Sequence, residues 1–363
     1  MPKIIVKHII FIVIIIEYFL IAVGGIEIHA VASQYSAILT PNRGLEFDHQ
    51  SSIIINRQNL SISEGRIEVR NEFLNNSPST LSARLTFPLP LVPWANTLMP
   101  YFYDYDPYHA AANINFLNFS VWVNQQEFRP QIQIVALNSR GENITAELIN
   151  IGGTALLMMP GGYEREDSRL NENMIRRLAE IGALLEDVER GPEFVTLNWE
   201  VEIKFQWEQN FPPGITVIEY RHRFLSRGGF LNVNSAENQS DTIEIEREEN
   251  IQRNFCMEIS TVRHIQRHVR TNARRIQQTY FGVPGEGEVL SYTPMGSNGF
   301  TAQIRNFHIK IQGNVSTSRR LAGLPSLCTD LPLRRTNPYL IEGTIENYTP
   351  TSDLRILFIH LAR

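Results

Sequence analysis

The sequence has little of what marks most enzymes and nucleic-acid-binding proteins. Its 363 residues include only two cysteines, and 33 Lys and Arg against 38 Asp and Glu leave a net charge of −5. A broad binder of nucleic acid or anionic membrane needs a basic surface, which this balance argues against. There is no Gly-x-Ser-x-Gly elbow, no Gly-Lys-Ser/Thr phosphate loop and no Gly-x-Gly-x-x-Gly fingerprint after a strand. The sequence therefore indicates no catalytic residue and no cofactor.

Long apolar runs are also missing, except at the start of the chain. Residues 1–32 have the three parts of a secretory signal peptide: two lysines, an apolar run over residues 9–23, and an Ala-Val-Ala triplet that ends at Ala32. The run is short of the roughly 20 apolar residues that span a membrane, and it contains Glu17. We expect cleavage after Ala32 and a periplasmic or secreted mature chain. The alternative is an uncleaved anchor, and membrane contact is expected only through this segment if it is retained.

The two cysteines, Cys256 and Cys328, both lie in the part expected to be exported. Two cysteines in an oxidising compartment commonly pair. Their disulfide would close a loop of about 70 residues, which the chain-entropy model values at roughly 4 kcal/mol. The alternative is two buried free thiols.

Alternation of apolar and polar residues dominates the mature chain. Residues 195–207 are apolar at every second position, which predicts a long strand with one buried face. The two prolines of residues 210–214 predict a turn, after which residues 218–224 resume the alternation, so we expect an antiparallel hairpin. The nearly continuous apolar run 354–361 predicts a central strand covered on both faces. The segment 282–299 is rich in Gly, Pro and Ser and is predicted to be a loop.

Two segments have helical spacing of their apolar residues instead, residues 170–188 and 258–277. The predicted fold class is therefore mainly β, with two antiparallel β-sandwich-like domains and these two amphipathic helices. The signal peptide would be followed by an N-terminal β-sandwich domain with the first helix inserted, over 33–226. A C-terminal β domain with the basic helix would cover 227–363.

An aromatic and acidic segment supplies the first candidate binding site. Carboxylates with imidazole can bind a metal, and exposed aromatic rings can stack on sugars. The candidate ligand-binding residues are Tyr103, Asp104, Asp106, Tyr108 and His109. The alternative is a loop that packs its own aromatic side chains over the sandwich.

The basic face of the helix predicted over 258–277 supplies the second candidate. Arginine forks suit phosphate or lipid-linked sugars. The candidate anion-binding residues are Arg263, Arg267, Arg270 and Arg274. The alternative is a solvated face paired with nearby glutamates. His264 and His268 are one turn apart, but Ile265 stands where a zinc enzyme of that type has Glu, so we predict no metal site.

Motifs spread over the mature chain carry a resemblance to a known family. They lie at residues 60–77, 85–90, 116–124, 207–214, 219–223, 255–256, 306–311 and 348–358. In this order they resemble the bacterial domain-of-unknown-function family 4424, with a departure at residues 281–287, where the family often has a Trp-containing turn. The resemblance implies a secreted or periplasmic bacterial protein and carries over no catalytic residue. Residues 33–226 are also weakly similar to vault/inter-alpha-trypsin-inhibitor type β domains.

These observations favour an exported envelope protein that acts as a non-enzymatic binding or structural module for an unknown envelope or extracellular partner. One alternative is a hydrolase of envelope glycan or peptide, which should have a cleft with shifted pKa values. Another is a strand-exchange assembly factor, which should have a long unprotected edge strand. A binder should instead expose an apolar or aromatic patch.

Overall fold

The computed structural model describes most of the chain after the predicted signal segment. The described residues are 42–47, 52–89, 92–93, 115, 117–157, 162–164, 170–186, 194–223, 227–234, 242–245, 254–276, 285–294, 303–313 and 323–361. All of them belong to one compact unit, Pro41–Arg363. The predicted signal peptide, residues 1–32, lies outside them. No helix within these ranges has the length and hydropathy to span a membrane.

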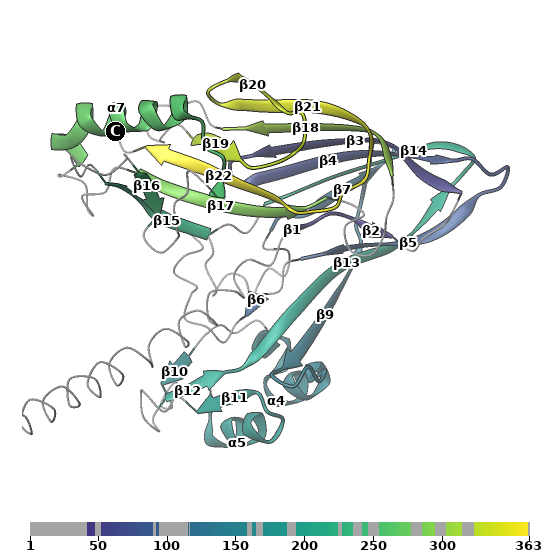
Figure 1. The fold of residues 1–363 in the computed structure, drawn as a ribbon. Helices are drawn as coiled ribbons and strands as arrows, with labels where there is room; N and C mark the ends of the chain where they lie inside the picture. Colours follow the sequence, from purple (N-terminus) through teal and green to yellow (C-terminus); the bar gives the residue numbers. More distant parts are fainter. Residues whose placement is uncertain are drawn as a thin grey trace, which may run out of the picture. The chain divides into compact units, whose positions relative to one another are not determined.

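The largest sheet has eight strands in the order β20-β21-β18-β3-β4-β14-β7-β8 (Figure 1). Its strands are β3 (Ile53–Ser63), β4 (Arg66–Asn75), β7 (Ser120–Val123), β8 (Gln126–Phe128), β14 (Gly214–His222), β18 (Ile304–Gln312), β20 (Arg334–Asn337) and β21 (Leu340–Tyr348). Neighbouring strands are antiparallel except β3 and β18, which run parallel. Every second residue of β4 is buried, because alternate side chains of a strand point to opposite faces and one face is covered.

Three further sheets complete the described β structure. The six-stranded sheet has the order β16-β15-β17-β22-β19, and β1 also pairs with β17, in parallel. The five-stranded sheet has the order β2-β5-β13-β6, and β9 also pairs with β13. The smallest sheet has the order β10-β12-β11. The bounds are β1 (Asn42–Arg43), β2 (Glu46–Phe47), β5 (Leu81–Pro88), β6 (Val92–Pro93), β9 (Gln131–Asn138), β10 (Gly162–Glu164), β11 (Leu184–Glu186), β12 (Phe194–Leu197), β13 (Trp199–Phe211), β15 (Arg227–Asn234), β16 (Thr242–Ile245), β17 (Gly285–Thr293), β19 (Gly323–Leu327) and β22 (Leu354–Leu361).

One large hydrophobic core is shared by the three larger sheets. Its members include Ile55 and Phe73 from the eight-stranded sheet, Phe205 from β13, and Leu290 and Ile356 from the six-stranded sheet. Fully burying one such side chain contributes about 1.5–3 kcal/mol. The fold is mainly β and sandwich-like, as the alternation predicts.

Strand β22 is covered on both faces, as its apolar run predicts. It lies between β17 and β19. Leu354, Ile356 and Phe358 contribute to the large core. Leu357 and Ile359 contribute to a second, smaller cluster. Because alternate residues face opposite sides, β22 separates the two clusters.

The helices partly match the prediction. Helix α7 (Ile259–Ile276) confirms the helix expected over 258–277. The expected helix over 170–188 is wrong in its second half, because α5 spans only Glu172–Glu180 and is followed by strand β11. Gly182, in the left-handed region with φ of +69°, ends the helical path.

Helix α4 (Thr145–Leu157) was not predicted from the sequence. It contains Gly153, whose φ of 74° and ψ of −176° interrupt the helical backbone. Two adjacent glycines lower helix propensity and hide the helical pattern. Ile144 and Leu148 nevertheless anchor this segment in the large core.

Two strand predictions are also corrected. The expected hairpin does not form, because β13 pairs with β5, β6 and β9 whereas β14 pairs with β4 and β7. The turn at residues 211–214 therefore carries the chain from one sheet to another. The segment 282–299 is not wholly a loop, because residues 285–293 form β17, which pairs with both β15 and β22.

Sheet pairing crosses the predicted domain boundary at residue 226. β18 and β21 come from the C-terminal part of the chain, yet β18 hydrogen-bonds directly to β3. The division into residues 33–226 and 227–363 is thus not a division between sheets.

Candidate functional site

Helix α7 lies on the outer face of the six-stranded sheet, and it carries the predicted anion-binding residues. Val262 and Ile265, three positions apart, are buried in the smaller cluster with residues of β17, β19 and β22. The other members are Phe255, Met257, Val289, Leu324, Leu357 and Ile359. This contact sets the rotation of the helix about its axis, so the arginines cannot turn toward the sheet without losing it.

The arginines form a stripe along one side of α7. Arg263 and Arg267 are exposed and lie one helical turn apart. Arg270 and Arg274 follow Arg267 by three and seven positions, which places them on the same side of the helix backbone, and their side chains lie outside the described ones. The helix sequence contains no Asp or Glu. Positive charges near the C-terminal end of a helix also interact favourably with the helix dipole.

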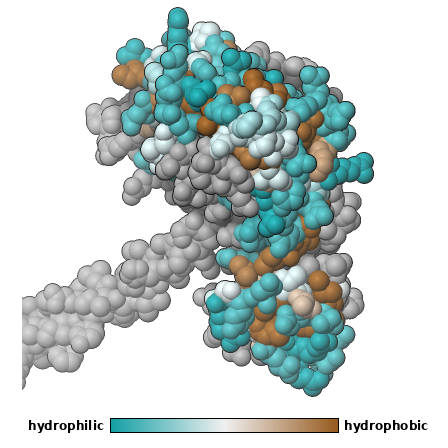
Figure 2. All heavy atoms as spheres, turned by 90° about the vertical axis from the view of Figure 1, so that its right-hand side faces the viewer, coloured by the Kyte–Doolittle hydropathy of each residue, from teal (hydrophilic) through white to brown (hydrophobic). Residues whose placement is uncertain are grey.

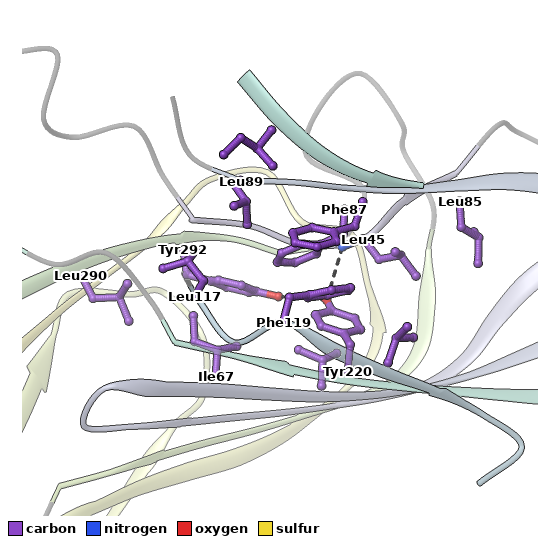
Figure 3. Packing of buried hydrophobic residues seen from close by; sticks show 14 of the residues in the cluster. Leu45, Ile67, Leu85, Phe87, Leu89, Leu117, Phe119, Tyr220, Leu290 and Tyr292 are labelled. Atoms are coloured by element: carbon purple, nitrogen blue, oxygen red, sulfur yellow. Dashed lines mark hydrogen bonds between the residues drawn. The ribbon is translucent and has the colours of Figure 1, made fainter. Parts of the chain in front are cut away.

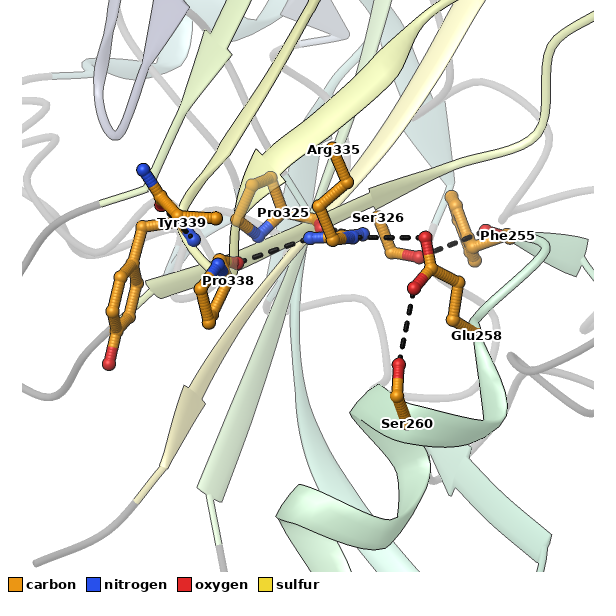
Figure 4. A network of polar contacts seen from close by, with 9 residues as sticks. Phe255, Glu258, Ser260, Pro325, Ser326, Arg335, Pro338 and Tyr339 are labelled. Carbon is orange, nitrogen blue, oxygen red and sulfur yellow. Dashed lines mark hydrogen bonds and ion pairs between the residues drawn. The ribbon is translucent and has the colours of Figure 1, made fainter.

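Arg335 fastens the start of α7 to the strands beneath it (Figure 4). Its Nε donates to Glu258 Oε1 at 3.1 Å, just before the helix begins. Its Nη1 donates to the carbonyl of Pro338 at 3.1 Å and its Nη2 to the carbonyl of Pro325 at 3.0 Å. One guanidinium thus joins three segments, a role that its planar fork of donors permits and a lysine ammonium does not.

A disulfide reinforces the same junction. Cys256 and Cys328 are bonded, with Cα atoms 4.9 Å apart, across a sequence separation of 72 residues. Next to it, Ser326 Oγ donates to the carbonyl of Phe255 at 3.1 Å. The segment that leads into α7 is therefore held to β19 by a covalent bond and by hydrogen bonds.

The first candidate site of the sequence falls outside the part of the chain that the structure describes. Its residues are Tyr103, Asp104, Asp106, Tyr108 and His109. His264 is exposed on α7. In the described part of the chain, no group of three or more His, Cys, Asp or Glu side chains is placed to hold a metal ion.

Sequence reasoning missed a buried polar group inside the large core (Figure 3). The hydroxyl of Tyr220 accepts from the backbone N–H of Leu45 at 3.3 Å and lies 3.4 Å from the hydroxyl of Tyr292. Tyr220 and Tyr292 are each 1% exposed. These contacts link β14 of the eight-stranded sheet to β17 of the six-stranded one. The alternation of residues 218–224 placed Tyr220 and His222 on one face, but no local signal identified their partners.

Burial controls the protonation of these side chains. It raises the pKa of Tyr220 to about 12 and raises that of Tyr292 as well. It lowers the pKa of His222 to about 4, because a charged imidazolium is poorly solvated in the core. His222 Nδ1 lies 2.6 Å from the carbonyl of Arg223, and its ring packs 4.8 Å from Phe87. These groups are therefore buried and neutral near pH 7, and the contact between Tyr220 and Tyr292 joins the two sheets inside the core.

Together these features define a mainly β, disulfide-bonded protein that carries an anchored basic helix. The chain belongs to the family described as "Domain of unknown function (DUF4424)", whose model matches residues 34–357. This confirms the family resemblance of the sequence, whereas the likeness to vault/inter-alpha-trypsin-inhibitor domains stays a prediction.

The remaining comparisons assign no activity to this chain. No curated protein matches the chain. A crystal structure from Legionella pneumophila, described as a "putative nutrient binding protein", shares 8% identity with a TM-score of 0.35, covering 88% of this chain and 70% of that one. Similarity at this level supports no inference about the fold or the ligand of the present chain.

Proposed function

We propose that this protein is an exported bacterial envelope protein that works as a non-enzymatic binding module. The observation that carries the proposal is the anchored helix α7. A disulfide, the three-way Arg335 contact and an apolar cluster hold it, while Arg263 and Arg267 are exposed. A stable disulfide is typical of proteins that fold outside the cytoplasm. Fixing a binding element in advance lowers the entropy lost on binding.

The chemistry of the arginine stripe favours an anionic group as the ligand of this module. Arg263, Arg267, Arg270 and Arg274 would bind phosphate or another anion of an envelope surface by charge-assisted hydrogen bonds. Two of these side chains are exposed one turn apart, and the helix has no acidic residue to neutralise them.

Export is tested on the protein recovered from cells. An intact mass measured before and after reduction should correspond to a chain that begins at Ser33, with a gain of two hydrogens on reduction. Recovery of the untrimmed, reduced chain from the cytosol would contradict the proposal.

Anion binding is tested with soluble inorganic polyphosphate, which presents phosphate groups without a membrane. Titration calorimetry should show that the mature chain binds it, and Arg263→Glu/Arg267→Glu should abolish this binding. The control is Arg305→Glu/Arg334→Glu, which makes the same charge change at two exposed arginines of the eight-stranded sheet. Equal loss in both variants would indicate a general charge effect and contradict a role for α7.

A further inference from the structure

Among the described residues, strand β9 leaves part of one edge unpaired. It pairs with β13 on one side, and on the other an isolated bridge joins Leu137 to Asn143. On the other side, Ala136 N–H donates to Thr145 Oγ1 at 2.8 Å and its carbonyl accepts from Ile144 N at 2.9 Å. Because residues of an antiparallel strand alternate in hydrogen-bond direction, the N–H and C=O groups of Ile132 and Ile134 point outward like those of Ala136. Within the described ranges, nothing bonds to these four groups.

The sequence of strand β9 lacks the features that normally protect edge strands. Natural edges carry charges, prolines or bulges that prevent pairing with another chain. The sequence of β9, QIQIVALN, has no charge and no proline, and its register with β13 is regular. Next to the proposed contact, Lys204 and Glu202 of β13 lie opposite Gln133 and Val135 and form an ion pair, with Nζ 2.8 Å from Oε1.

Apolar side chains of the inner sheet faces are exposed at the same edge. Ile132, the cross-strand partner of Phe205, is 43% exposed. Phe128, at the end of β8, is 39% exposed, and its ring lies 5.9 Å from that of Trp207. Figure 2 shows that hydrophobic atoms reach the surface in small groups among hydrophilic ones on the face it draws. The edge therefore combines free backbone groups with apolar surface.

We propose that β9 pairs antiparallel with β9 of a second copy of this chain, which gives a two-fold symmetric dimer with a continuous sheet. The strand is self-complementary in one register. With Gln133 opposite Gln133 of the second copy, Ile132 lies opposite Ile134, and the outward groups of both isoleucines find partners. Isoleucine side chains then meet on one face and glutamine amides on the other, which are favourable cross-strand pairs.

The chain itself limits the ladder to this length. Pro130 has no N–H to donate at the next outward position on one side. The outward groups of Ala136 are already bonded on the other side. So short an interface buries less than the roughly 1,200–2,000 Å² of stable complexes, so the dimer forms reversibly with concentration. This inference does not depend on the proposed role of α7.

Sedimentation velocity of the mature chain over a range of concentrations tests the dimer. The wild-type mass should rise from that of one chain toward two, and Ile132→Lys should weaken association about tenfold or more, since two-fold symmetry counts each change twice. The control is Ile215→Lys, because Ile215 is 55% exposed on β14, and it should associate like the wild type. Circular dichroism verifies that each variant is folded.

A second variant tests the register. Gln133→Glu places two carboxylates opposite each other at the two-fold axis, so it should weaken association at neutral pH and regain it when the carboxylates are protonated. Amide exchange at Ile132 and Ile134 should slow as wild-type concentration rises. A wild-type mass that stays at one chain up to the solubility limit, or a dimer unaffected by Ile132→Lys, would overturn the proposal.

Discussion

At the residue scale, His222 is the side chain whose environment has the clearest consequence for the stability of the fold in acid. It is 2% exposed and lies between aromatic rings of the core. The carbonyl of Arg223 is an acceptor only, so Nδ1 carries the proton of the neutral ring. Nε2 then has no bonding partner in the part of the chain that the structure describes. Protonation would therefore place a charge in the core with no acceptor for its proton.

Stability should fall in acid because of this histidine. Its pKa is lowered from 6.5 to about 4 on folding, so between these values the unfolded chain binds a proton that the folded chain does not. The contribution of neutral His222 to the free energy of unfolding is complete above pH 6.5 and is lost as the pH falls toward 4. Between pH 7 and 4.5 this loss amounts to about 2–3 kcal/mol. Urea unfolding of the wild type and His222→Phe at both pH values measures it. The variant should lose that much less stability in acid, and equal losses would contradict the assignment.

The sequence predicted which face of a strand a residue lies on, but it did not predict which residues that side chain contacts. The alternation placed Tyr220 and His222 on the core face, and the fold confirms that placement. It could not identify Leu45 or Tyr292, because these contacts join residues 175 and 72 positions apart. Contacts at that separation depend on how sheets stack, which no local pattern encodes.

At the element scale, the anchoring of α7 is the feature to test. Arg335→Lys keeps the charge but cannot reach all three acceptors, so the start of α7 should open more easily. We expect the opening free energy of the Val262 N–H, which donates to the carbonyl of Glu258 in the first turn, to fall by about 1–2 kcal/mol in hydrogen exchange. The exposed neighbour Arg334 provides the control, since Arg334→Ala should leave this amide unchanged. Unchanged protection in Arg335→Lys would show that the disulfide and the apolar cluster suffice.

Element type was predictable where the hydrophobic period was long and unbroken. The spacing of apolar residues in α7 and the alternation of β13 both survive in the fold. Residues 183–188 continue a helical spacing by coincidence, and tertiary pairing of β11 with β12 overrides it. β17 was hidden because Gly285 and Gly287 lower strand propensity, although neighbours on both sides hold the strand.

At the scale of the whole molecule, connectivity between sheets was the part that the sequence could not supply. An alternating strand, a Pro-Pro-Gly turn and a second alternating strand predict a hairpin, yet here the turn joins two sheets. The two strands each find their partners elsewhere: Phe211 lies opposite Leu81 and Gly214 lies opposite Asn75. The chain between β4 and β5 makes the same passage beside it. These two crossings form a sheet corner, residues 75–81 and 211–214.

Asn75 holds this sheet corner together, and its removal should weaken the whole fold. Its Nδ2 donates to the carbonyls of Ser79 and Phe211, both at 2.8 Å, and its Oδ1 accepts from Ser77 N at 2.8 Å. Asn75 is 3% exposed, so Asn75→Ala leaves the carbonyl of Phe211 buried without this donor. We expect a loss of about 2–4 kcal/mol in the free energy of unfolding.

The neighbouring asparagine supplies the matched control for that measurement. Asn76 is exposed, and it donates through its backbone N–H to the carbonyl of Ser52, a bond that Asn76→Ala retains. Asn76→Ala should therefore change stability by no more than about 0.5 kcal/mol. Urea unfolding followed by tryptophan fluorescence compares both variants, because Trp199 and Trp207 lie on β13, which leads into the sheet corner. Equal stability of the two variants would mean that the prolines and the pairing of β13 and β14 with their own sheets fix the crossing without Asn75.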